Sequence, residues 1–127
     1  MPSWYPRAEQ LVLDWLRAGT AVPVFTETDE NLATLAPALK VQVFGGGSSV
    51  QLTRSPSVEI CAYAAGRGAA LDLMDEADRR MMALAGSGFE SRFVDDVRLL
   101  FHPSVEPYAN TGLHQATATY TFDIRPQ

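Results

Sequence analysis

The sequence predicts a small α+β domain with the element order α-β-β-β-α-β-β, in which a mixed or antiparallel sheet of four or five strands carries both helices on one face. The first observation behind this prediction is the strict alternation of apolar and polar residues over 113–125, which is typical of a strand with one buried face. The second is a pair of stretches, 7–18 and 69–85, that each carry one apolar stripe at helical spacing. One-sided strands and one-sided helices bury their apolar faces against each other, which favours two layers.

The first predicted element is a helix over residues 7–18. Its apolar positions follow the i, i+3, i+4, i+7 pattern, and they are Ala8, Leu11, Val12, Trp15 and Leu16. Pro6 suits a first turn, and Gly19 suits a left-handed position just past the end of the helix. A short strand is expected over 22–27, and the segment 28–38 is expected to be a loop closed by Pro37.

Two further strands are predicted over 39–44 and 57–65, because apolar and polar residues alternate in both. The connection between them is rich in glycine and serine, which predicts a hairpin with a long, mobile tip. We expect this tip to become ordered against a partner. The residues of the tip that we assign to a partner interface are Gly45, Gly46, Gly47, Ser48, Ser49 and Arg54.

The second helix, over 69–85, has the clearer stripe, made of Ala70, Leu73, Met74, Ala77, Met81 and Leu84. On its solvent side, Asp75–Arg79 and Glu76–Arg80 have the spacing of acidic-to-basic i, i+4 pairs. Gly86 and Gly88 are expected to end the helix. A strand over 93–102, a proline-containing loop over 103–112 and the terminal strand complete the chain.

One flank of the second helix departs from a simple division into core and solvent sides. Leu71 and Met82 lie to one side of the apolar stripe, beside Asp75 and Asp78. Single exposed apolar residues are common on protein surfaces, so this pattern has an ordinary interpretation. It also fits a flank that is buried against another chain, and we treat these four residues as interface candidates.

Composition limits the function classes that the chain can belong to. Its 127 residues, 46% of them hydrophobic, fit a single domain spanning residues 1–127. The net charge of −5 and the single lysine, Lys40, argue against tight binding to DNA phosphates. A lone cysteine, Cys61, excludes an internal disulfide. No apolar run approaches the length of a membrane span, and the first residues do not form a secretory signal pattern, so no membrane association is expected.

No catalytic group can be assembled from the sequence. The triple glycine is not followed by the lysine of a P-loop, nor directly by the helix of a dinucleotide site. His102 and His114 flank the last loop and could approach each other, but a zinc site wants four ligands. Cys61 has no nearby base in the sequence. We therefore expect no enzymatic activity, cofactor or metal; a small ligand-binding domain or enzyme that uses the glycine loop and the two histidines stays open as an alternative.

Several segments carry a resemblance to a known family. They are the stretch from Ala8 to Leu16 (AEQLVLDWL), Val22-Pro23-Val24, the stretch from Leu39 to Gly46 (LKVQVFGG), the stretch from Pro56 to Ala64 (PSVEICAYA) and Tyr120-Thr121-Phe122. In this order, with an alanine-rich helix after the fourth segment, they resemble the tail terminator (tail-completion) proteins of long, non-contractile-tailed bacteriophages. The resemblance runs from about Ala8 to Arg125 and contains no catalytic signature.

The resemblance implies a structural protein of the virion that is not an enzyme and needs no cofactor. Such proteins form a hexameric ring of like subunits on the head-proximal end of the tail tube, stop tube polymerisation and contact the head-completion or neck proteins. DNA passes through the ring without tight binding, which the acidic composition suits. The expected location is the virion tail, reached from the host cytoplasm during assembly. Another head–tail connector component is the alternative within the same class.

Overall fold

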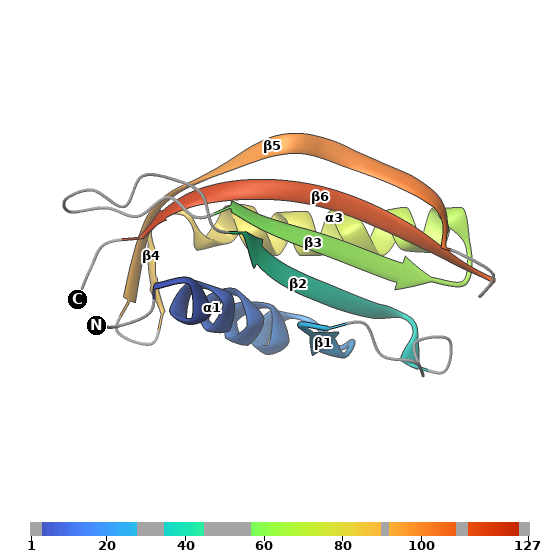
Figure 1. The fold of residues 1–127 in the computed structure, drawn as a ribbon, viewed down its shortest axis with the longest axis horizontal. Coiled ribbons are helices and arrows are strands. Elements are labelled where there is room, and N and C mark those ends of the chain that lie inside the picture. Colours follow the sequence, from blue (N-terminus) through green and yellow to red (C-terminus); the bar gives the residue numbers. More distant parts are fainter. Residues whose placement is uncertain (1–3, 28–34, 45–56, 90–91, 109–111, 125–127) are drawn as a thin grey trace.

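The computed structural model describes residues 4–27, 35–44, 57–89, 92–108 and 112–124. Within them, one sheet is covered on one face by two helices (Figure 1). The elements in chain order are α1 (Trp4–Gly19), β1 (Val24–Phe25), β2 (Ala38–Phe44), β3 (Ser57–Ala64), α3 (Arg67–Leu84), β4 (Ser87–Phe89), β5 (Arg92–Tyr108) and β6 (Leu113–Ile124). The predicted α+β class is confirmed, and the predicted order is present with one additional short strand, β4.

The sheet has the strand order β1-β2-β3-β6-β5-β4, so β6 lies between β3 and β5 in the middle of the sheet. Only β1 and β2 pair in parallel; every other neighbouring pair is antiparallel. The prediction of four or five strands is therefore wrong, because the described sheet has six. The missed strand contains Gly88 and follows Gly86, whose positive φ of 73° turns the chain and whose N–H donates to the Val94 carbonyl at 2.8 Å.

Strand β5 is longer than the sequence predicts, because residues 103–108 continue it instead of forming a loop. Pro103 and Pro107 caused the error, since proline cannot donate a hydrogen bond to a neighbouring strand. In the structure, β4 pairs only with the first residues of β5, up to Val94, so β6 is the only described neighbour of the rest of β5. A proline is tolerated there if its nitrogen faces away from β6, and register shifts at Leu99/Phe101 and Phe101/Ser104 adjust the pairing.

The main hydrophobic core lies between the sheet and the two helices. Both helices contribute residues with no exposed surface, among them Leu16 from α1 and Met74 from α3. These pack in one cluster with Ile60, Ala118 and Phe122, which share the covered face of the sheet. Alternate residues of β3 and β6 belong to this cluster, as the alternation in the sequence predicts.

Trp15 and Arg80 join the two helices in a way that the sequence does not predict. The Trp15 indole Nε1 donates to the Arg80 carbonyl at 2.7 Å, and the Arg80 guanidinium lies 4.4 Å from the centre of the Trp15 ring. Arg80 Nη2 also donates to the Trp15 carbonyl at 3.4 Å. The expected solvent-side pair of Glu76 and Arg80 is therefore wrong in its placement of Arg80, which reaches across to α1.

This contact also corrects the role assigned to Gly19. Gly19 is the last residue of α1, and the described glycines with positive φ are Gly86 and Gly112 instead. A Cβ atom at Gly19 would overlap the guanidinium group of Arg80. Glycine is therefore required at this position for the close approach of α3, and not for a left-handed conformation.

The buried hydroxyl of Tyr120 supplies a first test of the packing. This hydroxyl donates to Asp78 Oδ1 at 2.6 Å, and the Tyr120 side chain is fully buried. We expect Asp78→Ala to lower the free energy of unfolding by about 1–3 kcal/mol, because it leaves a buried donor without an acceptor. Tyr120→Phe removes the donor as well and should cost about 1 kcal/mol. Urea denaturation of both variants measures the difference; a smaller loss for Asp78→Ala than for Tyr120→Phe would contradict this account.

Candidate functional site

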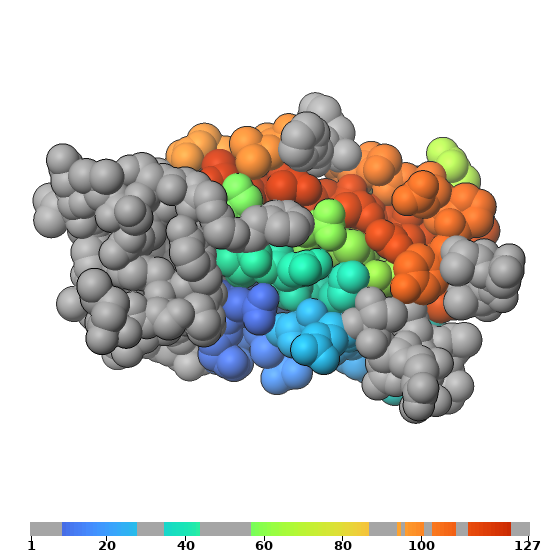
Figure 2. All heavy atoms as spheres, in the orientation of Figure 1, coloured from blue at the N-terminus to red at the C-terminus, as the bar shows by residue number. Residues whose placement is uncertain are grey.

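The face of the sheet opposite the helices is the largest surface that the described elements leave uncovered. It carries the polar residues of the alternating strands, such as Glu59 on β3 and Thr117, Thr119 and Thr121 on β6, all of them partly exposed. Figure 2 shows this face, with β2, β3, β6 and β5 side by side across its centre. A flat, polar sheet face of this kind is suited to contact with another macromolecule rather than to catalysis.

One end of this open face is covered by the chain itself. Ala38, Cys61, Tyr63 and Leu113 form a second buried cluster there, with Phe25, Ala36 and Tyr108 packed against it. The rings of Tyr63 and Tyr108 meet edge to face with 5.0 Å between their centres. The Tyr63 hydroxyl is buried and has no hydrogen-bond partner among the described residues. Burial is the main cause that raises the pKa of this phenol, so it stays neutral.

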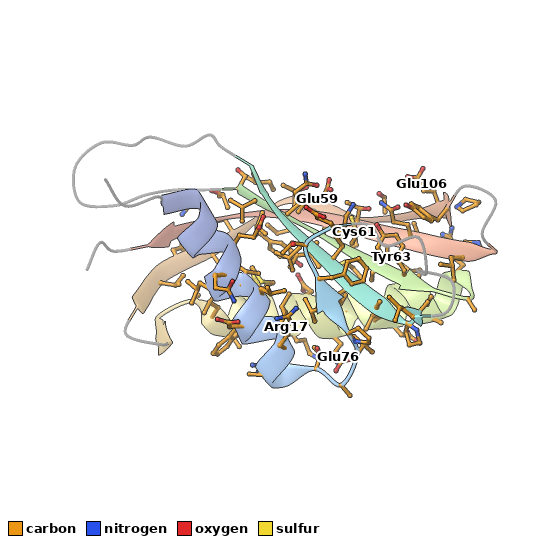
Figure 3. All side chains as sticks on the ribbon, turned by 60° about the horizontal axis from the view of Figure 1, so that its bottom comes forward. Arg17, Glu59, Cys61, Tyr63, Glu76 and Glu106 are labelled. Atoms are coloured by element: carbon orange, nitrogen blue, oxygen red, sulfur yellow. The ribbon has the colours of Figure 1, made fainter. Side chains whose placement is uncertain are left out.

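Cys61 lies inside this second cluster and is fully buried (Figure 3). Its Sγ atom is 3.6 Å from Gln115 Nε2, 3.7 Å from Glu59 Oε1 and 3.8 Å from Thr117 Oγ1. Burial raises the pKa of the Cys61 thiol, and the negative charge of Glu59 raises it further. A cysteine nucleophile needs the opposite shift, because the thiolate is the reactive form. The environment of Cys61 therefore favours a neutral thiol with a packing role.

The raised pKa of Cys61 leads to a prediction about pH. The unfolded thiol ionises near pH 8.5, while the native thiol resists ionisation, so native stability is full below that pH and declines as pH rises above it. We expect a loss approaching about 1.4 kcal/mol per pH unit from this one group. Denaturant titrations between pH 8 and pH 10 measure the slope. Cys61→Ala should remove most of it, and an equal slope in that variant would contradict the prediction.

The two histidines do not come together. His114 on β6 pairs in register with Pro107 of β5, which is five residues from His102 along that strand, or roughly 15 Å. The His114 ring is partly buried, with Nδ1 lacking a hydrogen-bond partner. Strand alternation places Cys61 and His114 on opposite faces of the sheet. Among the described residues, no three His, Cys, Asp or Glu side chains gather in a group that could hold a metal ion.

The α3 flank, defined as Leu71, Asp75, Asp78 and Met82, is partly exposed as the helical wheel predicts. Met82 is 44% exposed, one of three large apolar residues of the described chain that are exposed; Leu71 is half-buried and Asp75 is exposed. Asp78 differs from the expectation because it accepts the hydrogen bond of Tyr120 and so also supports the core. The other interface candidates, Gly45, Gly46, Gly47, Ser48, Ser49 and Arg54, lie outside the described residues, as does the predicted mobile tip.

Comparison with known proteins extends the description of the fold. No family model matches the chain, and no curated protein sequence matches it. Among solved structures, the chain is similar to a chain from the virion of a native gene transfer agent particle, with a TM-score of 0.68 and 10% sequence identity. The match covers 98% of this chain and 100% of the other. The two proteins therefore share their fold over essentially their whole length. Within the described residues, no helix combines the length and the apolar character that crossing a membrane requires.

Proposed function

We propose that this protein is a structural component of a phage-like virion, and that within the virion it acts as the tail terminator. The observation that carries the proposal is the fold likeness to a virion chain over 98% of this protein. The sequence resemblance to tail terminators of long-tailed phages supports the finer assignment independently, since it depends on residues and not on the fold comparison. In this role the protein caps the head-proximal end of the tail tube and joins it to the head-completion proteins.

A terminator ring needs surfaces rather than a catalytic centre. A closed ring of like subunits uses a heterologous interface, so each subunit presents two different patches to its neighbours. The α3 flank supplies one, through exposed Met82 and half-buried Leu71. The open face of the sheet supplies a polar surface for the second contact or for the tube protein. The chain's net charge of −5 suits a lumen through which DNA slides without being held.

Tube length in vitro tests this proposal directly. Tail tube protein from the phage or prophage that encodes this chain is polymerised with and without the purified protein, and tube lengths are measured by negative-stain electron microscopy. We expect addition of the protein to shorten the tubes and to place a ring at one end. A sixfold ring in class averages supports a homo-hexamer. Unchanged tube lengths together with binding to DNA-filled heads would replace the terminator assignment with that of a neck component. Binding to neither would overturn the virion assignment.

A further inference from the structure

The two outer edges of the described sheet differ in how their backbone groups are satisfied, and α1 is responsible for one of them. Helix α1 and strand β1 lie along the same side of β2 (Figure 1). Strand β1 pairs with β2 only at Leu39 and Lys40, so it does not extend to the far end of β2. An unpaired strand edge is a template on which another chain can add a strand.

Side chains of α1 occupy the backbone groups at this edge. The Leu39 N–H donates to the Pro23 carbonyl at 2.9 Å, which shows that Leu39 directs its N–H toward the β1 side. Backbone N–H groups alternate sides along a strand, so the N–H of Val43 points to the same side, beyond the end of β1. There it donates to Glu9 Oε2 at 3.2 Å. The carboxylate takes the place of a neighbouring strand's carbonyl.

The outermost strand, β1, is treated in the complementary way. Because Pro23 accepts from Leu39, the next carbonyl, that of Val24, faces away from β2. Arg17 binds this carbonyl with two groups, Nη2 at 2.8 Å and Nε at 3.1 Å. Arg17 lies on α1 (Figure 3). One helix thus provides an acceptor for a free donor and a donor for a free acceptor at the same sheet edge.

We infer that Glu9 and Arg17 close the β1–β2 edge against strand addition by a second copy of this chain. Without them, two copies pair these edges about a twofold axis, because an isologous contact needs only this one edge from each copy. The β5 edge is a poor partner, since Pro103 and Pro107 lack N–H groups and register shifts interrupt it. This inference depends on the geometry of one subunit and does not require the terminator function.

The test is the double variant Glu9→Ala/Arg17→Ala, studied as full-length protein by light scattering over a concentration series. We expect a concentration-dependent dimer and, in the dilute monomer, exchange of the Val43 amide hydrogen at least about tenfold faster than in the wild type. The matched control is Gln10→Ala/Asp14→Ala, which removes a hydrogen-bonded pair from the exposed side of the same helix, 2.7 Å between Nε2 and Oδ1. The control should behave as the wild type does.

Further variants keep the inference falsifiable. Glu9→Gln keeps an acceptor oxygen and should remain monomeric. Adding Val43→Pro to Glu9→Ala removes the outward N–H and should abolish the dimer, because proline is tolerated at an edge strand when its nitrogen faces outward. If the double variant does not fold, Glu9→Ala alone carries the test. A variant that stays monomeric at every concentration, or Val43 exchange at the wild-type rate, would overturn the inference.

Discussion

Replacing Trp15 with alanine is expected to lower the free energy of unfolding by about 3 kcal/mol, and the melting temperature by about 10 °C. The Trp15 ring packs against the main core, supports the Arg80 guanidinium and donates a 2.7 Å hydrogen bond to the Arg80 carbonyl. Alanine removes all three contacts at the place where α1 meets α3. Thermal unfolding followed by circular dichroism and denaturation in urea both measure the loss.

Two companion variants separate the contributions. Trp15→Phe keeps an aromatic face for Arg80 but loses the N–H donor, so it should cost about 1–1.5 kcal/mol. Arg80→Met keeps an unbranched side chain over the ring but removes the cation, at a cost of about 0.5–2 kcal/mol. A loss below about 1 kcal/mol for Trp15→Ala would show that the contact does not hold the helices together, since a merely exposed residue has an effect of that size.

The features that the sequence predicts well are those set by local periodicity. The alternation over 113–125 predicts β6, and the stripe containing Leu73, Met74 and Ala77 predicts the buried face of α3. All three of these helix residues are buried in the structure. Periodicity works here because the residue's position along a regular element alone determines which face it occupies.

The features that the sequence misses depend on residues far apart in the chain. Pro103 and Pro107 resemble loop residues until one knows that β5 has β6 as its only described neighbour there. Gly19 resembles a helix-ending residue until the Arg80 guanidinium is placed against it. Each of these residues has a common local role and a less common tertiary one. Only the packing of distant elements decides between the two roles.

The candidate site shows the same division. The helical wheel correctly predicts that Met82 is exposed, because exposure follows from position on the helix. It places Asp78 beside Met82 but gives no sign of the hydrogen bond from Tyr120, which lies 42 residues away in sequence. The capping of the Val43 N–H by Glu9 is equally remote, with 34 residues between the two. Hydrogen bonds of this type have no sequence signal, since many other acidic residues would suit the acceptor role.

Introducing two charges on the α3 flank, with Leu71→Asp and Met82→Asp, is expected to abolish tube capping while leaving the protein folded. Met82 is 44% exposed and Leu71 is half-buried, so the free subunit tolerates aspartate at these positions better than an interface would. In a ring, each new carboxylate would be buried against a neighbour without a partner, which is strongly unfavourable. Tubes grown with the variant should be as long as tubes grown with no terminator.

The control for this experiment must add the same charge elsewhere. Gln10→Asp/Ala18→Asp places two carboxylates on exposed positions of α1, and this variant should shorten tubes as the wild type does. Since Leu71 is half-buried, Met82→Asp alone is measured in parallel; it should keep the wild-type melting temperature and still weaken capping. Normal capping by the Leu71→Asp/Met82→Asp variant would remove the α3 flank from the interface. Unfolding of that variant, with normal capping by Met82→Asp, would instead assign Leu71 to the core, because only a residue that packs within the subunit destabilises the free protein when it becomes charged.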